Sequence, residues 1–216
     1  MGAAPLRVAC LASGRGSNFE ALIQAQRRGE TAGATVVTLG VNRPGCGAYQ
    51  RAQKLGVPSF LVDHQEFDSK AAFEAMLCEH LKASEAELIV LAGFMRILSD
   101  HFLREIRVPV VNLHPALLPA FPGLHGIEEA FRAGVRLSGC TTHFVTETVD
   151  DGPILMQGLV PIFSEDRLDD FRDRMHAMEH RILPATVAAI ARGDLAWSKE
   201  GLVSKPHFKP YLLTAD

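Results

Sequence analysis

Short apolar runs alternate with longer segments of helical period along the first half of the chain. The run from Leu88 to Ala92 is apolar throughout, which is typical of a strand covered on both faces of a parallel sheet. Alternating strands and helices at this spacing predict right-handed crossovers and a doubly wound, Rossmann-like α/β sheet. The strands are expected at 6–12, 34–41, 59–62, 88–92 and 108–114, and the helices at about 19–28, 67–83 and 99–106.

The pattern changes in the second half. Two strand-like runs, 139–145 and 153–162, are joined by a short acidic turn, which favours antiparallel pairing. A long helix is expected at about 167–192, because its apolar residues recur every three or four positions. Pro184 is expected to kink or interrupt that helix, and a hairpin is expected around residues 199–201. We therefore predict a mostly parallel sheet with an antiparallel extension in the C-terminal half.

Composition narrows the class of protein. The 216 residues carry 22 Lys and Arg against 25 Asp and Glu, a net charge of -3, which argues against a dedicated binder of nucleic acid or anionic membranes. The longest uncharged apolar run, 88–95, is far shorter than the roughly 20 residues of a membrane span. The N-terminus lacks the pattern of a signal peptide, and the four cysteines are scattered singly. We expect a cytoplasmic protein with reduced cysteines.

A first candidate site is the segment Gly14 to Asn18, between the first predicted strand and helix. Small residues there let backbone N–H groups approach an anion, and the helix N-terminus adds positive potential, so we expect a phosphate monoester. A dinucleotide fingerprint is not met, because Phe19 takes the third glycine position and no acidic residue follows the second strand. The alternative is a tight turn in which Ser17 or Asn18 caps the helix.

A second candidate lies at the end of a predicted central strand. Asn112 and His114 project to the same face there, because side chains alternate along a strand. An amide and an imidazole that reach one oxygen are suited to stabilising an oxyanion. The alternative is that both are polar groups paired with local backbone.

Three further groups carry candidate chemistry. Acidic residues are common in turns, so those in the turn 146–152 are expected to lie in solvent. If Asp150 contacted His114, however, its negative charge would favour the charged form of the imidazole. A metal site made of His114, His125, His143 and Asp150 is disfavoured, because no ligand spacing is present. His176, Glu179 and His180 flank the apolar stripe of the long helix, either in solvent or facing a cleft.

Several ordered motifs together resemble the phosphoribosylglycinamide formyltransferases, from about residue 6 to residue 193. The resemblance rests on the segments 13–18, 91–98, 112–119, 121–125, 142–145, 150–153 and 179–180. It implies the formyltransferase fold and transfer of a formyl group from 10-formyltetrahydrofolate to the primary amine of glycinamide ribonucleotide, in purine biosynthesis and without a metal.

The resemblance also implies roles for individual residues. Asn112 and a protonated His114 would stabilise a tetrahedral oxyanion, and Asp150 would assist. The implied nucleotide-binding residues are Gly16, Ser17, Asn18, His176 and Glu179. The implied folate-binding residues are Lys70, Met95, Arg96, Ile97, Leu98, Asn112, Thr146, Glu147, Thr148, Val149 and Asp150.

The chain departs from the family pattern at a few positions. Lys70 replaces an Arg that contacts the folate glutamate in many members, which puts affinity for the folate tail in doubt. His176 stands where others have Lys or Gln. We expect one domain over 1–216, with a nucleotide-phosphate half at about 1–110, a catalytic and folate half at about 111–193 and an extension at 194–216. The expected partners are the two small-molecule substrates, and the expected state is a monomer or weak homodimer.

Two related activities and one non-catalytic function remain as alternatives. A formyltetrahydrofolate hydrolase shares the Asn, His and Asp, but it would give the phosphate segment and Glu179 little purpose, and we expect no room for its N-terminal domain. A methionyl-tRNA formyltransferase would need a tRNA-binding domain. A nucleotide-binding module would need only residues 14–18 and would give Asn112, His114 and Asp150 no special role.

Overall fold

A computed structural model describes residues 4–198 and 201–213 and divides between Val111 and Asn112 into two units. In the first unit the strand order is β3-β2-β1-β4, and every pairing is parallel. The strands are β1 (Arg7–Ala12), β2 (Thr35–Val41), β3 (Ser59–Leu61) and β4 (Leu88–Leu91). Residues Val8 to Ala12 of β1 are fully buried, so β1 forms the centre of this core.

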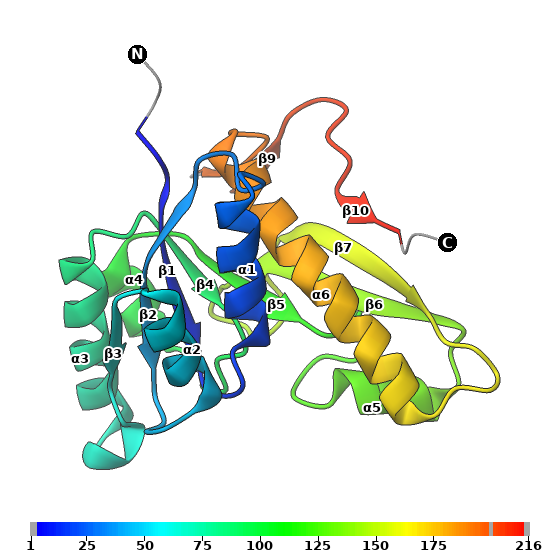
Figure 1. The fold of residues 1–216 in the computed structure, drawn as a ribbon, viewed down its shortest axis with the longest axis horizontal. Helices are drawn as coiled ribbons and strands as arrows, with labels where there is room; N and C mark the ends of the chain where they lie inside the picture. Colours follow the sequence, from blue (N-terminus) through cyan, green and yellow to red (C-terminus); the bar gives the residue numbers. More distant parts are fainter. Residues whose placement is uncertain (1–3, 199–200, 214–216) are drawn as a thin grey trace. The chain divides into compact units, whose positions relative to one another are not determined.

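Helices cover both faces of the first unit's sheet. Figure 1 shows α1 and α2 on one side of the strands and α3 and α4 on the other. The helices are α1 (Ser17–Arg27), α2 (Gly47–Leu55), α3 (Lys70–Ala83) and α4 (Asp100–Ile106), with a short 3-10 helix η1 (His64–Glu66). Helix α3 begins at Lys70, later than the predicted start at 67, because the Ser69 hydroxyl accepts the Ala72 N–H at 3.1 Å and caps it there.

The second unit combines antiparallel and parallel pairing. Strand β6 (Leu137–Phe144) lies between β5 (Val110–His114) and β7 (Ile154–Pro161), and it is antiparallel to β7. Strand β10 (Tyr211–Leu212) is parallel to β7. The predicted antiparallel extension is therefore confirmed.

One long helix covers this part of the sheet. Figure 1 shows α6 (Leu168–Ala191) running across β6 and β7, while α5 (Gly126–Ala133) packs against α6. The expectation that Pro184 interrupts the long helix is wrong, because α6 continues through it. Pro184 lies in a largely buried stretch of α6, and packing there offsets the backbone hydrogen bond that a proline removes.

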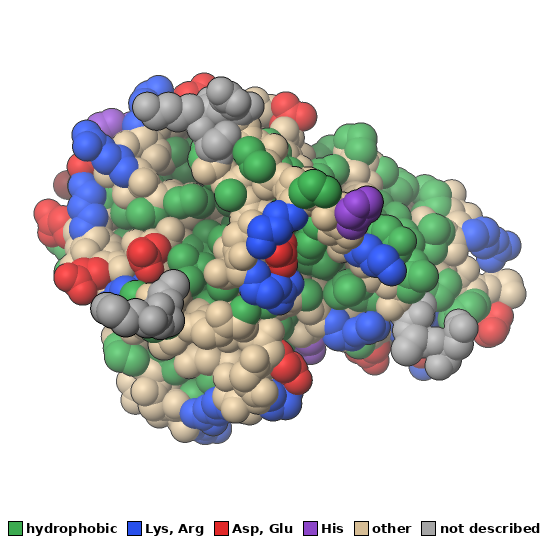
Figure 2. Space-filling view, turned by 90° about the horizontal axis from the view of Figure 1, so that it is seen from above, with side chains coloured by type: hydrophobic (Ala, Val, Ile, Leu, Met, Phe, Trp, Pro, Cys, Tyr) green, Lys and Arg blue, Asp and Glu red, His purple; other side chains and the backbone are tan. Residues whose placement is uncertain are grey.

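The C-terminal segment forms the predicted hairpin. Strand β8 (Leu195–Ser198) pairs antiparallel with β9 (Gly201–Ser204), while residues 199 and 200 of the predicted turn lie outside the described residues. Within the described ranges, no helix has the length and apolar character needed to cross a membrane. Figure 2 shows basic and acidic side chains among hydrophobic ones in the view that it draws.

Candidate active site

The polar pair predicted at a strand end lies at the carboxyl end of β5. His114 is the last residue of the strand and is 3% exposed, whereas Asn112, two residues earlier, is half-buried. Their alternation along β5 gives the arrangement that the sequence predicts. A buried imidazole needs partners for both ring nitrogens, and these come from two loops of the same unit.

The first partner is Asp150, in the turn between β6 and β7. Its Oδ2 lies 3.3 Å from Nδ1 of His114, and the carboxylate side chain is only 8% exposed. The Gly123 N–H donates to the same Oδ2 at 2.8 Å. Asp150 has a φ of 55°, a left-handed conformation that a non-glycine residue adopts at some cost. The structure thus brings together the two residues whose contact the sequence could not establish.

The second partner is the backbone of the loop that follows β5. Nε2 of His114 lies 2.8 Å from the carbonyl oxygen of Phe121 and donates to it. Nδ1 then faces an ionised carboxylate, which only accepts hydrogen bonds. Both ring nitrogens of His114 therefore face an acceptor oxygen.

A fourth residue, His143, completes the cluster. Its Nδ1 lies 3.0 Å from the Phe144 carbonyl oxygen, so Nδ1 carries a proton, and Nε2 of the neutral ring can accept from Nδ2 of Asn112 at 3.1 Å. Nε2 of the same ring lies 3.6 Å from Oδ1 of Asp150. Asn112, His143, Asp150 and His114 therefore form one continuous chain of contacts. From the sequence, His143 is expected only as part of a matched motif and as a disfavoured metal ligand.

The charge state of Asp150 follows from these neighbours. Burial acts to raise the pKa of Asp150, but the His143 ring, the Gly123 N–H and the charge on His114 favour the ionised form and hold the pKa below the ordinary value of 3.8. Asp150 is therefore an anion at neutral pH, and it stabilises positive charge on the adjacent imidazole.

The predicted phosphate segment lies in the first unit, at the start of α1. Gly16 occupies the N-cap position with a φ of 77°, and no side chain caps the helix. The alternative in which Ser17 or Asn18 is the cap is therefore wrong. A Cβ at Gly16 would lie 2.5 Å from Cα of Ala48, so a glycine lets this segment touch the start of α2.

The predicted folate segment after β4 also lies in the first unit. Met95 and Ile97 are 54% and 64% exposed, Arg96 is exposed and Leu98 is buried. The Met95 N–H donates to Oγ of Ser13 at 2.8 Å, which fixes the start of the segment to the end of β1. Two large exposed apolar side chains on a fixed loop are typical of a binding surface.

The remaining predicted folate residues are exposed side chains. Lys70 is the first residue of α3, and its side chain is 49% exposed. In the turn 146–150, Glu147, Thr148 and Val149 are exposed, while Thr146 is half-buried and donates from Oγ1 to the Thr148 carbonyl at 3.4 Å.

The predicted nucleotide residues on α6 form a pair. Oε2 of Glu179 lies 3.0 Å from Nδ1 of His176, and the Glu179 side chain is 7% exposed. The hydrogen bond with Glu179 raises the pKa of His176 above its ordinary value of 6.5, against the effect of burial. The pair therefore offers a buried carboxylate beside a partly exposed cation.

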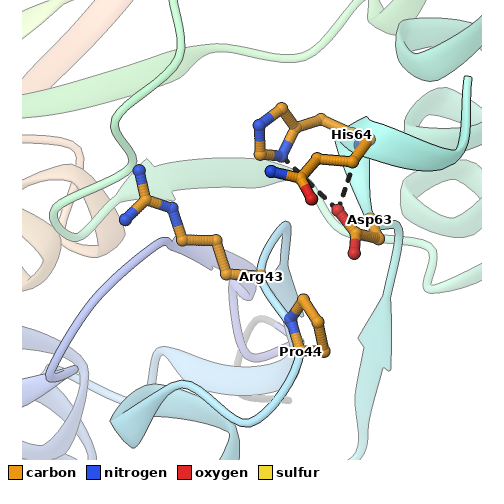
Figure 3. A pocket seen from close by; sticks show the side chains of 5 residues that line it. Arg43, Pro44, Asp63 and His64 are labelled. Carbon is orange, nitrogen blue, oxygen red and sulfur yellow. Dashed lines mark hydrogen bonds and ion pairs between the residues drawn. The ribbon is translucent and has the colours of Figure 1, made fainter.

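A hollow of about 430 Å³ lies in the first unit after β2 and β3, and it contains none of the predicted site residues. Figure 3 shows the side chains of Arg43 and His64, two of the residues that line it. The other lining residues are Pro44, Asp63 and Gln65. No sequence motif marks these residues. In the described part of the chain, no three His, Cys, Asp or Glu side chains form a group that could hold a metal ion.

Comparisons with known proteins place this geometry in a family. A model of the formyl transferase family matches residues 6–187. The phosphoribosylglycinamide formyltransferase of Bacillus subtilis is 39% identical over 181 residues, which are 84% of this chain and 92% of that protein. The crystal structure of glycinamide ribonucleotide transformylase 1 from Symbiobacterium toebii matches with a TM-score of 0.89 and 36% identity, over 95% of this chain and 96% of that one.

The chain belongs to the formyl transferase family. Its relatives of similar length bear the name phosphoribosylglycinamide formyltransferase, as the sequence motifs predicted. A longer relative, the trifunctional purine biosynthetic protein adenosine-3 of Drosophila melanogaster, is 46% identical over 195 residues. The chain spans only 14% of the length of that protein. The predicted family and the predicted fold are both confirmed.

Proposed function

We propose that the protein transfers the formyl group of 10-formyltetrahydrofolate to the primary amine of glycinamide ribonucleotide. The observation that carries the proposal is the connected cluster of Asn112, His143, Asp150 and His114, which gathers an amide, imidazoles and a carboxylate at one strand end. Oxyanion stabilisation needs the first two groups, and proton transfer needs the third. The family match supports the choice of a formyl group.

Attack of the amine nitrogen on the formyl carbon forms the new C–N bond and places negative charge on the formyl oxygen. The Asn112 amide has two N–H groups, of which one is used by His143, so the other can donate to this oxyanion. Nε2 of His114 donates to the Phe121 carbonyl in the structure, so we propose that the formyl oxygen replaces this carbonyl as the acceptor when the substrates bind. His114 thereby adds a charged donor.

The intermediate collapses when the bond from the formyl carbon to folate N10 breaks. The amine must lose a proton and N10 must gain one, so a group in the site has to carry the proton from one nitrogen to the other. Asp150, ionised because its pKa is low, accepts the proton directly or through an ordered water and returns it to N10. The reaction needs no covalent enzyme intermediate, and positioning of the two substrates supplies much of the rate.

The two substrates use the remaining predicted residues. Gly16, Ser17 and Asn18 at the start of α1 bind the nucleotide phosphate through backbone N–H groups. His176 and Glu179 bind the nucleotide, Glu179 through its ribose hydroxyls. The folate contacts Lys70, the segment 95–98 and the turn 146–150. We propose that the protein acts in the cytoplasm, as a monomer or weak homodimer of one domain.

The test is an absorbance assay of a 10-formyl folate donor, with and without glycinamide ribonucleotide. We expect deformylation only when the nucleotide is present, together with formylated nucleotide that mass spectrometry detects. Equal deformylation without the nucleotide would instead identify a hydrolase. No deformylation in either condition would leave a nucleotide-binding module.

A further inference from the structure

Glu74 of α3 is a buried carboxylate that the proposed reaction does not use. It is 3% exposed, and such burial of a carboxylate is costly unless hydrogen bonds and a cation compensate. Oε1 accepts the Ser99 N–H at 2.8 Å, and Oε2 accepts the Ser99 hydroxyl. The Lys70 ammonium lies 3.8 Å from Oε1, one helical turn away on the same helix. The Glu74 carboxylate therefore has two kinds of partner, the hydrogen-bond donors of Ser99 and the ammonium of Lys70.

Ser99 connects Glu74 to the exposed segment 95–98. It follows Leu98 directly and is the N-cap of α4, where its Oγ accepts the Phe102 N–H at 3.2 Å. The other end of the segment is held by the hydrogen bond from the Met95 N–H to Ser13. The segment is thus fixed at both ends, and Glu74 provides one of the two attachments.

We propose that Glu74 is a positioning residue for the folate substrate. The Glu74 carboxylate holds Ser99 and thereby fixes the position of the C-terminal end of the 95–98 segment. The same carboxylate attracts the Lys70 ammonium and so limits the positions that this ammonium can take. A lysine is a flexible point charge that lacks the planar fork of arginine, so a fixed anion beside it supplies part of the missing orientation. This inference rests on the proposed function, because that proposal assigns Lys70 and 95–98 to the folate.

The test compares Glu74→Ala and Glu74→Gln with a matched control, Glu79→Ala, an exposed carboxylate on the same helix. Glu74→Ala removes both kinds of partner, and we expect the KM for the formyl folate to rise by about 10-fold, the usual effect of losing a buried charged hydrogen bond. Glu74→Gln keeps one acceptor oxygen for the Ser99 N–H, and its amide can donate to the Ser99 hydroxyl, but it removes the charge beside Lys70, so a smaller rise of about 3-fold is expected. The control should leave KM unchanged.

The KM for glycinamide ribonucleotide and kcat should stay within about 2-fold in all three variants, since Glu74 does not reach the reacting atoms. An equal rise in both KM values, or a loss of thermal stability without any change in the folate KM, would overturn the inference. If Glu74→Ala does not fold, the Gln variant decides on the same criteria.

Calorimetric titration with tetrahydrofolate separates this inference from the proposed function. If the wild-type protein shows no transfer, the proposed function fails, but weaker tetrahydrofolate binding by Glu74→Gln than by Glu79→Ala would still support the role of Glu74. Equal affinities of the two variants, or no binding by the wild type, would overturn it.

Discussion

His114 and Asp150 face each other at 3.3 Å, from Nδ1 to Oδ2, although they come from different loops of the chain. His114 ends β5, and Asp150 lies in the turn between β6 and β7. The Phe121 carbonyl accepts from the other ring nitrogen of His114, and the Gly123 N–H donates to Oδ2 of Asp150, so each side chain is held by a further contact. Such fixed orientation is what electrostatic stabilisation of a transition state requires.

The low pKa of Asp150 predicts a specific pH dependence of stability. A carboxyl whose folded-state pKa is depressed contributes stability that is present above its unfolded value, near 3.8, and is lost as the pH falls through the folded pKa. In Asp150→Asn this contribution is absent. We expect the difference in unfolding free energy between wild type and variant to shrink as urea denaturation is repeated from pH 7 down to about pH 3. A difference that stays constant with pH would contradict the ion pair.

The contact between His143 and Asn112 predicts a positioning role for His143. In His143→Ala the Asn112 amide loses its acceptor, so we expect kcat to fall by about 10-fold with both KM values unchanged. In His143→Gln the side-chain oxygen can replace Nε2 as an acceptor and should restore part of the rate. Equal rates in the two variants would show that the hydrogen bond to Asn112 does not matter.

The close packing of Gly16 against α2 predicts that a larger residue at this position destabilises the phosphate segment. Gly16→Ala adds a Cβ 2.5 Å from Cα of Ala48, and we expect a loss of about 1–3 kcal/mol in unfolding free energy and a higher KM for the nucleotide. Gly29→Ala is the matched control, because Gly29 has the same φ of 77° but no atom within 4 Å of the added Cβ. Similar effects of both variants would mean that backbone strain alone, and not the contact with α2, is responsible.

The His176 and Glu179 pair predicts how nucleotide binding depends on pH. Glu179 raises the pKa of His176, so His176 keeps its charge to a higher pH than an ordinary histidine and loses it as the pH rises further. We expect the KM for glycinamide ribonucleotide to rise with pH in the wild type and to be nearly flat in His176→Gln. Glu179→Gln should weaken binding of the nucleotide by about 10-fold and leave the KM for the folate unchanged. A change in the folate KM would show that these residues are assigned to the wrong substrate.

Much of the fold could be predicted, because a segment whose apolar residues recur with a clear period fits only one type of secondary structure. The apolar run at β4 and the stripe on α6 gave the correct elements. Helices α2 and α5 were missed, because each is short and its burial depends on packing that no local pattern reveals. The interruption expected at Pro184 does not occur, because packing along a buried stretch of α6 offsets the hydrogen bond that the proline removes.

The site was predictable where one strand carries the residues. The alternation along β5 places Asn112 and His114 correctly. Contacts between segments that are distant in the sequence depend on the tertiary structure, however, so a local sequence pattern does not predict them. Nothing local indicates that Asp150 faces His114, that the Phe121 carbonyl holds the ring, or that His143 joins Asn112 to the cluster. The roles of the individual site residues stay predictions.

Steady-state kinetics of His114→Ala tests the central claim most directly. Loss of a charged oxyanion donor should lower kcat for nucleotide-dependent formyl transfer by about 10³-fold, while the KM values for both substrates stay nearly unchanged. A variant that keeps its full kcat, or one whose only defect is a higher KM, would contradict the proposal that His114 stabilises the transition state.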